Sequence, residues 1–236
     1  MSDPGAWLTP GEAEALWLSL KTGLAGTALS LPPGIVVAWV LARGNFPGKI
    51  VLDGLVHLPL VLPPVVTGYL LLVLFGHGGA MGQFLERTFG LVVAFNWKGA
   101  ALASAVMGFP LLVRAIRLAF EAVDPKLEAA ARTLGASPAD VFMSVTLPLI
   151  TPGLIAGALL GFARALGEFG ATITFVANIP GETQTLPLAL YSALQVPGGG
   201  IDAARFVILS LVLAIAALGA SEYFARAMRR RIGVAT

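Results

Sequence analysis

Five stretches of the chain consist almost entirely of apolar residues, and the polar residues concentrate between them. A membrane-spanning helix needs about 20 mainly apolar residues, and each stretch reaches that length. The pattern therefore predicts an all-α, polytopic membrane protein. Its five transmembrane helices are expected at Trp17–Ala42, Ile50–Phe75, Gly99–Phe120, Leu149–Phe175 and Ala204–Ala227.

Prolines interrupt most of these stretches. A proline removes a backbone donor and bends a helix, which neighbouring helices in a membrane bundle can accommodate. Such breaks favour a bundle that lines a pathway over an inert membrane anchor. The prolines are Pro32 and Pro33 in the first stretch, Pro59, Pro63 and Pro64 in the second, Pro110 in the third and Pro152 in the fourth.

Composition supports the membrane interpretation. Of 236 residues, 57% are hydrophobic and 12% are charged, whereas an ordinary soluble domain carries about 25% charged residues. The mean hydropathy is +0.85. Too few polar side chains are present to cover a soluble surface, so an ordinary soluble domain is excluded.

Residue counts also narrow the possible chemistry. The chain has no Cys and two His, which excludes disulfides, thiolate metal sites and cysteine nucleophiles. We therefore expect no metal site and no catalytic residues. A net charge of +2 gives no indication of nucleic-acid binding. The stretch GNFPGKI (Gly44–Ile50) departs from the phosphate-loop spacing and lacks its Ser or Thr, so we expect no nucleotide bound by this chain.

The distribution of Lys and Arg predicts the orientation. The connections around spans one to two and three to four, together with the end of the chain, hold ten of the fifteen basic residues. By the positive-inside rule that side is cytoplasmic. The segment 1–16 is then external, and the basic tail 228–236 is cytoplasmic. The ten residues are Arg43, Lys49, Arg114, Arg117, Lys126, Arg132, Arg226, Arg229, Arg230 and Arg231.

A polar segment between the third and fourth stretches predicts two short helices in a cytoplasmic loop, 123–148. Asp124 can cap the first helix, with Pro125 at its first position. Gly135 can end that helix in a left-handed conformation, and Ser137 can cap the second. The loop is compact enough to fit a groove on another protein. An amphipathic connector lying on the lipid headgroups explains the same pattern equally well.

The same loop resembles the EAA loop of the permease subunits of binding-protein-dependent ABC importers. The family pattern is Glu-Ala-Ala, three residues, Gly, nine residues, an aliphatic residue, one residue and Leu-Pro. The family's Glu position holds Ala129, and Glu128 lies one residue early, which leaves the carboxylate contact to the ATPase open. The residues that match are Ala130, Ala131, Gly135, Val145, Leu147 and Pro148.

Other stretches resemble molybdate permeases in particular. These are RGNFPGK (Arg43–Lys49), HLPLVLPPVVTGYLLLVLFG (His57–Gly76) and FARALGEFGATITFVANIPGETQTLPLALY (Phe162–Tyr191). The resemblance covers nearly the whole chain. Sulfate and thiosulfate permeases share the Arg-Ala-x-Gly-Glu-Phe-Gly core but are less similar around GETQTLP, so they remain the alternative.

The resemblance implies a type I ABC importer permease that moves molybdate, or tungstate, by alternating access. The implied partners are a dimer of ABC ATPase subunits, a second copy of this chain, a periplasmic molybdate-binding protein and membrane lipid. ATP and Mg²⁺ would bind the ATPase, and this chain would hold no cofactor and catalyse no reaction. The residues expected to couple to the ATPase are Glu128, Ala130, Ala131, Arg132, Gly135, Ser137, Leu147 and Pro148.

Polar residues within the fourth stretch are pathway or gate candidates. Arg164 and Glu168 are four residues apart and share a helix face. A self-neutralising ion pair is the favoured interpretation, and a positive potential along an oxyanion path is the alternative. Thr172 and Thr174 could donate to an oxyanion, although bonds back to their own helix are favoured.

The external segment 176–202 has an apolar middle, Leu186–Leu194, that is too short to span a membrane. We expect a re-entrant or interfacial helix there. Glu182 and Gln184 are candidates for contact with the binding protein. Gly153, Gly157 and Gly161 predict close helix packing, within the subunit or at a dimer seam. His57 is expected to act in helix packing or capping.

Two other functional classes fit the pattern less well. An ion-coupled carrier or channel would need intramembrane carboxylates or inverted repeats, and apart from the Arg164–Glu168 pair the sequence offers neither. A membrane-embedded enzyme would need a catalytic constellation that two His and no Cys do not supply.

Overall fold

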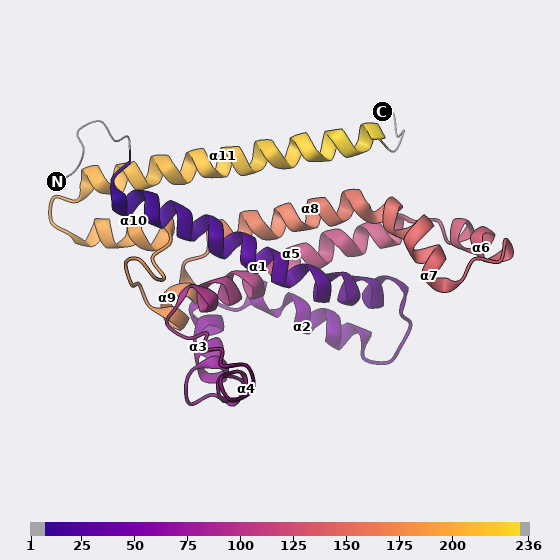
Figure 1. Cartoon of the computed structure of the whole chain (residues 1–236), viewed down its shortest axis with the longest axis horizontal. Helices are drawn as coiled ribbons and strands as arrows, with labels where there is room; N and C mark the ends of the chain where they lie inside the picture. Colours follow the sequence, from indigo (N-terminus) through magenta and orange to yellow (C-terminus); the bar gives the residue numbers. More distant parts are fainter. Residues whose placement is uncertain (1–7, 232–236) are drawn as a thin grey trace.

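A computed structural model describes residues 8–231, and within that range the protein is helical without β-strands (Figure 1). Four helices are long and apolar enough to cross a membrane, and the bent pair α2–α3 makes a fifth crossing if it is counted as one. The elements are α1 (Pro10–Arg43), α2 (Lys49–Val61), α3 (Pro64–Phe75), α4 (Ala80–Phe89), α5 (Trp97–Ala122), α6 (Pro125–Thr133), α7 (Pro138–Val141), the π-helical turn η1 (Phe142–Thr146), α8 (Leu147–Leu166), α9 (Gly170–Val176), α10 (Leu186–Gln195) and α11 (Gly200–Arg231).

Helices α1, α5 and α8 form the centre of the bundle. Small residues let them approach closely. A Cβ atom added at Gly26 of α1 would lie 2.7 Å from the carbonyl oxygen of Ala101, and one at Gly108 of α5 would lie 2.8 Å from that of Gly161. The predicted small-residue series of α8 therefore packs within the subunit, against α5. The core beside it contains Leu112, Val113, Ile116 and Phe120, all fully buried.

Helix α1 begins earlier than the apolar pattern indicated. The expected span started at Trp17, whereas the helix starts at Pro10 after a capping box formed by Thr9 and Glu12. The first turns of the helix contain acidic residues, which interrupt the apolar pattern. The start of the helix could therefore not be predicted from the length of the apolar stretch. Part of the predicted external segment 1–16 is therefore helical, and residues 1–7 of it lie outside the described residues.

The second expected span, Ile50–Phe75, is broken. Helices α2 and α3 meet at an angle of 113°. Pro63 and Pro64 follow the end of α2, and neither can donate the backbone hydrogen bond that would continue it. The prediction of one continuous span is wrong here. Hydropathy measures the length of an apolar stretch and gives no information about a change in the direction of the helix axis.

The fourth expected span, Leu149–Phe175, is also wrong as a continuous helix. Helix α8 ends at Leu166, the chain turns at Gly167–Phe169, and α9 follows as a separate short helix. At its other end α8 extends beyond the prediction, since α7, η1 and α8 together form one helix from Pro138 to Leu166. The helix capped by Ser137 and the apolar span were predicted as separate elements, and the sequence did not indicate that they form one helix.

The remaining helices occupy the ends and one side of the bundle. Figure 1 shows α6 and α7 projecting at one end, with α10 and the starts of α1 and α11 at the other. Helix α10 confirms the helix expected at Leu186–Leu194, whereas α4 was not predicted. Helix α11 is longer than the expected Ala204–Ala227 and takes in part of the predicted tail, of which residues 232–236 lie outside the described residues.

Candidate functional site

The projecting loop folds as its local chemistry predicted. The Asp124 side chain accepts a hydrogen bond of 2.9 Å from the Lys126 amide, and Pro125 opens α6. Gly135 has a φ of +90°, a conformation that favours glycine. Ser137 and Asp140 form a capping box at the start of α7. We call α6, α7 and their connection (residues 124–141) the coupling loop.

An ion pair ties the coupling loop to the bundle. Glu128 Oε1 accepts from Arg43 Nη2 at 3.2 Å and from Thr146 Oγ1 at 2.8 Å. Arg43 Nη2 also lies 3.4 Å from the Val123 carbonyl oxygen, to which it donates. This carboxylate therefore joins the end of α1, α6 and η1 within one subunit. The family resemblance implied a role for Glu128 in contact with the ATPase, whereas in this structure its side chain points inward.

The outer surface of the coupling loop carries exposed apolar groups. Leu134 at the turn is 89% exposed, Leu127 of α6 is 49% exposed, and Met143 directly after the loop is 64% exposed. Exposed apolar groups on an otherwise polar projection are typical of an interaction surface. Of the eight predicted coupling residues, three are half-buried, Glu128, Ala131 and Leu147, and five are exposed, Ala130, Arg132, Gly135, Ser137 and Pro148.

Arg164 and Glu168 form the predicted ion pair. Arg164 Nη1 lies 2.7 Å from Glu168 Oε2, and the Glu168 side chain is almost fully buried. The N–H groups are not aligned for a hydrogen bond to that oxygen, so the contact is electrostatic. The other oxygen, Oε1, accepts from the Ala171 amide at 2.8 Å. Glu168 therefore also caps α9, a role that the sequence did not reveal.

The two threonines of α9 differ in their surroundings. Thr174 Oγ1 donates to the Gly170 carbonyl oxygen at 2.8 Å, the intrahelical bond that was favoured from the sequence. Thr172 is buried, 1% exposed. Helix α9 packs against α3, with Ala171 close to Gly68. The Thr174 hydroxyl is therefore used within its own helix, and Thr172 is enclosed by the packing of α9.

The segment after α9 is held by its own polar side chains. Gln184 Nε2 donates to Asn178 Oδ1 at 3.0 Å, and Asn178 Nδ2 donates to Ser192 Oγ at 2.7 Å. Gln184 is half-buried, which corrects the expectation of an exposed contact residue. Glu182 is exposed as expected.

Charged side chains on α2 and α5 form a cluster that sequence reasoning missed. Charge counting placed Arg114 and Arg117 at the connection after the third span, but both lie inside α5. Arg117 Nη1 is 3.1 Å from Asp53 Oδ1, and its Nε is 2.8 Å from Glu121 Oε1. His57 Nδ1 is 2.8 Å from the Asp53 carbonyl oxygen, in the local role that was predicted. The spacing of four residues in Asp53–His57 and Arg117–Glu121 was the available signal.

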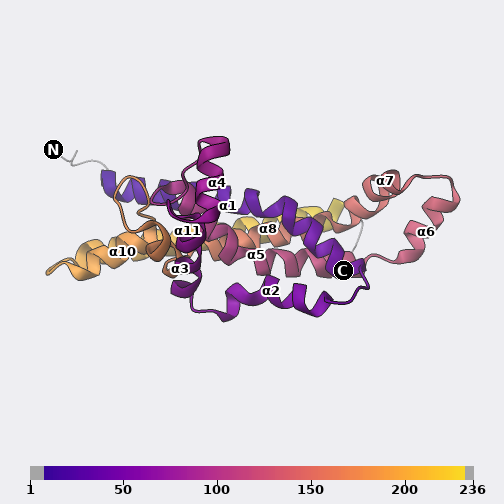
Figure 2. The same ribbon diagram turned by 90° about the horizontal axis from the view of Figure 1, so that it is seen from below.

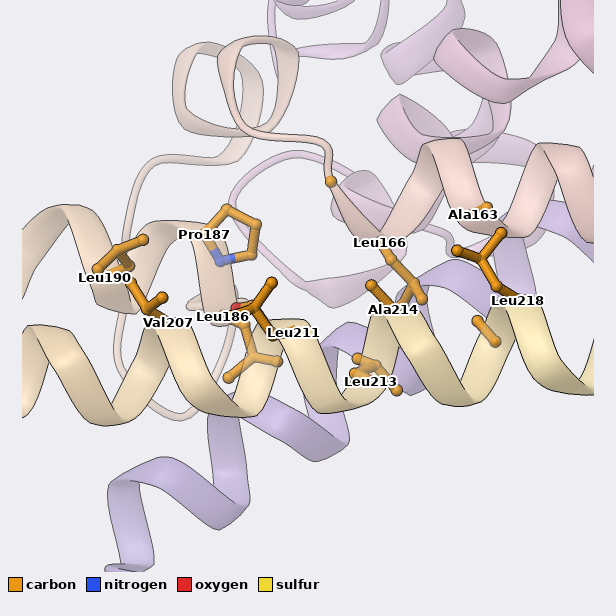
Figure 3. A pocket seen from close by; sticks show the side chains of 13 residues that line it. Ala163, Leu166, Leu186, Pro187, Leu190, Val207, Leu211, Leu213, Ala214 and Leu218 are labelled. Atoms are coloured by element: carbon orange, nitrogen blue, oxygen red, sulfur yellow. The ribbon is translucent and has the colours of Figure 1, made fainter.

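A large apolar cavity lies elsewhere in the bundle, between α8, α10 and α11. Its volume is about 470 Å³, and its lining includes Leu166, Leu190, Val207 and Leu211 (Figure 3). Ser210 also lines the cavity, but its hydroxyl already donates to the Phe206 carbonyl oxygen. The other walls are apolar and offer an anion no side-chain hydrogen-bond donor. The cavity is therefore not a candidate for the path of a charged solute.

Comparison with known proteins decides the family. A family described as "Binding-protein-dependent transport system inner membrane component" matches residues 34–230. The chain belongs to this family. The permease is thus a multi-pass inner-membrane protein of an ABC transporter, as the loop residues had indicated.

Curated relatives and solved structures agree with the family. The permease is 58% identical over 226 residues to "Molybdenum transport system permease protein ModB" of Escherichia coli (strain K12), covering 96% of this chain and 99% of the relative. It is 43% identical over 162 residues to "Sulfate transport system permease protein CysT" of Salmonella typhimurium, covering 69% and 58%. The MetNI methionine ABC transporter, inward facing, has a similar fold, with a TM-score of 0.69 at 19% identity and coverage of 97% and 99%. The type I importer permease fold is confirmed.

Proposed function

We propose that this chain is the membrane subunit of an ATP-driven importer for molybdate, with the similar anion tungstate as a second substrate. The observation that carries the proposal is 58% identity along 99% of a molybdenum transport permease. The match to the sulfate permease is weaker and covers less of both chains. Sulfate or thiosulfate is therefore the second candidate.

The coupling loop gives this proposal a mechanism. Two copies of the chain would enclose the pathway, and the exposed tip at Leu134 would bind in a cleft of the ATPase. ATP and Mg²⁺ would bind the ATPase, and this chain would make and break no covalent bonds. Because Glu128 joins the loop to α1 and η1, movement of the ATPase would reach both helices at once. ATP would favour one of two permease states through its differential affinity for them.

Orientation follows from the same loop. The end that carries α6 and α7 would be cytoplasmic, in agreement with the Lys and Arg distribution. The opposite end, with Glu182 exposed before α10, would face a periplasmic molybdate-binding protein. The start of α1 would then be external and the end of α11 cytoplasmic.

The test is transport by the complete complex in liposomes. We expect ATP-dependent uptake of radioactive molybdate in the presence of its binding protein, and ATPase stimulation by the molybdate-loaded binding protein. Excess tungstate should compete more strongly than sulfate. A complex that takes up sulfate in preference to molybdate, or that takes up neither, would overturn the substrate assignment.

A further inference from the structure

The charged cluster between α2 and α5 lies where these helices run side by side (Figure 2). A cavity of about 310 Å³ is lined by Asp53, His57, Arg114, Arg117, Leu118 and Glu121. At 1.5 Å per residue, His57 lies about 12 Å from the start of α2, and Arg114 lies about 12 Å from the end of α5. Both helix ends lie on the coupling-loop side of the bundle. The cavity therefore reaches from that end into the membrane-spanning part.

Arg117 holds both carboxylates of the cluster. Its Nη1 is 3.1 Å from Asp53 Oδ1, and its Nε donates to Glu121 Oε1 at 2.8 Å. Asp53 Oδ1 is also 3.3 Å from His57 Nδ1. These contacts make Arg117 a structural link between α2 and α5. Both carboxylates of the cavity are bound to Arg117, so neither pairs with the other guanidinium, that of Arg114.

Arg114 is that second guanidinium. Its side chain is exposed and, among the described residues, forms neither an ion pair nor a hydrogen bond in this structure. A cationic group in a membrane-spanning helix is costly when it faces lipid, so such groups face water-filled paths or partners. The Cα–Cβ bonds of a helix tilt toward its N-terminus, which directs Arg114 away from the nearer end of α5. The Arg114 side chain lines the cavity and is exposed, so it is accessible to a solute that enters there.

His57 supplies a second group with hydrogen-bonding capacity to spare. Its Nδ1 is 2.8 Å from the Asp53 carbonyl oxygen, which can only accept. Nδ1 therefore carries the proton, and Nε2 is left for another partner. Nε2 can accept a hydrogen bond from a water molecule that is bound to an anion.

We infer that this cavity is a transient binding site for the transported tetrahedral oxyanion on the coupling-loop side of the pathway. Arg114 donates to the anion's oxygens, and Nε2 of His57 accepts from a water molecule that the anion holds. The carboxylates of Asp53 and Glu121 stay nearby and limit the affinity, which suits a site from which an imported anion must leave. The volume is at the lower end of ligand cavities, about 300 to 1,000 Å³. The inference rests on the proposed function, since it assumes an oxyanion substrate.

A purely structural role for the cluster makes a different prediction. If the cluster only links α2 to α5, Arg117 carries that role and Arg114 can be replaced without consequence. If Arg114 only reaches lipid headgroups, replacement leaves transport unchanged as well. Arg114 therefore separates the binding site from both alternatives.

The experiment measures ATP-dependent molybdate uptake by the reconstituted complete complex. We expect Arg114→Gln to lower uptake by about tenfold, the loss of one charged hydrogen-bonding partner. Arg114→Lys should retain most of the uptake. Arg87→Gln, which removes an exposed positive charge from α4, is the matched control and should transport normally. Uptake by Arg114→Gln equal to that of the unaltered complex would overturn the inference.

A second measurement needs no transport. The chain has no Cys, so Leu118→Cys, at a cavity position that is 59% exposed, places a single thiol in the site. An anionic thiol reagent should react several-fold faster than a neutral one, millimolar molybdate should slow it, and Arg114→Gln should remove both effects. If these effects appear but the unaltered complex takes up no molybdate, the proposed function fails and the anion site stands. If uptake is normal but the introduced thiol shows neither effect, the inference fails alone.

Discussion

The two ends of the helical bundle are each fixed by an arginine–glutamate ion pair, but they differ in what they expose. At the coupling-loop end, Arg43 pairs with Glu128 and ties α1 to α6. At the other end, Arg205 Nη2 donates to Glu12 Oε2 at 2.8 Å and ties α11 to the first turn of α1. Each pair joins segments far apart in the sequence, so each fixes the position of a helix end that local structure alone would leave free.

The apolar residues that distinguish the two ends are Leu134 and Leu188. The coupling loop exposes Leu134 at 89%, whereas α10 at the other end buries Leu188 completely. Both ends leave some apolar surface uncovered within the single chain, since Leu194 and Ile201 at the α10 end are 66% and 78% exposed. The difference is that Leu188 belongs to the packed core, whereas Leu134 lies at a projecting turn where a partner protein can contact it.

The largest effect expected concerns the side of the membrane on which each end lies. Single cysteines at Ser137 and Glu182 test this, because both positions are exposed and the chain has no native Cys. In intact cells, a membrane-impermeant thiol reagent should label the cysteine at position 182 fully. The cysteine at position 137 should be labelled only after the cells are permeabilised. A reversed pattern would contradict the orientation, and the unaltered chain provides the background.

Coupling should be abolished by a proline at the turn of the coupling loop. Gly135 has a φ of +90°, and its amide donates to the Arg132 carbonyl oxygen at 3.0 Å. Proline fixes φ near −65° and has no amide hydrogen, so Gly135→Pro must reshape the loop. We expect an assembled complex whose ATPase no longer responds to the loaded binding protein.

A glycine outside both predicted contact regions supplies the matched control. Gly90 also has a positive φ, +64°, and it follows α4, outside the coupling loop and the segment 176–202. Gly90→Pro should strain its own turn and leave the ATPase response intact. A bulky residue at the half-buried Ala131 should behave like Gly135→Pro. Full stimulation in Gly135→Pro would show that the loop does not transmit the signal.

Two leucine substitutions measure the contrast between the ends directly. Leu188→Ala removes a fully buried side chain and should lower the free energy of unfolding by about 2–5 kcal/mol. Leu134→Ala removes an exposed one and should change that free energy by less than about 0.5 kcal/mol while weakening ATPase stimulation. Thermal unfolding in detergent, alongside ATPase assays, measures both. Equal losses of stability would contradict the assignment of Leu188 to the packed core and of Leu134 to an interaction surface.

A smaller effect than that of Leu188→Ala is expected for the coupling between Arg164 and Glu168. Each single alanine variant should lose stability, because it leaves one charge without its partner. The double variant should recover about 1–3 kcal/mol relative to the sum of the single losses. If the two losses simply add, the residues are not partners. Low anion uptake by a stable double variant would assign Arg164 an additional role in the pathway.

Features fixed by neighbouring residues were the most predictable from the sequence. The caps of the coupling loop depend on Asp124, Gly135 and Ser137 and on atoms within a few residues of each, so the sequence was sufficient. The fold was predictable from the family resemblance for a similar reason, because the residues of the family motif lie at fixed spacing in a short segment of the sequence.

Features fixed by distant contacts were not predictable. The end of α8 at Leu166 depends on Glu168 capping a second helix that packs against α3, and hydropathy is unchanged across that break. The inward direction of Glu128 depends on Arg43, 85 residues away in the sequence. The α2–α5 cavity requires two helices to lie side by side, which no property of either helix alone implies.

The continuous rod from Pro138 to Leu166 has a mechanical consequence. Its 29 residues span about 43 Å, so a tilt of about 10° at one end displaces the other by about 7 Å. The π-helical turn η1 lies near the base of this lever, between the coupling loop and the membrane-spanning part. A wider helical turn can absorb twist, because its hydrogen bonds can shift register without breaking the helix. The same helix can therefore act as a lever arm with a torsional joint at its base.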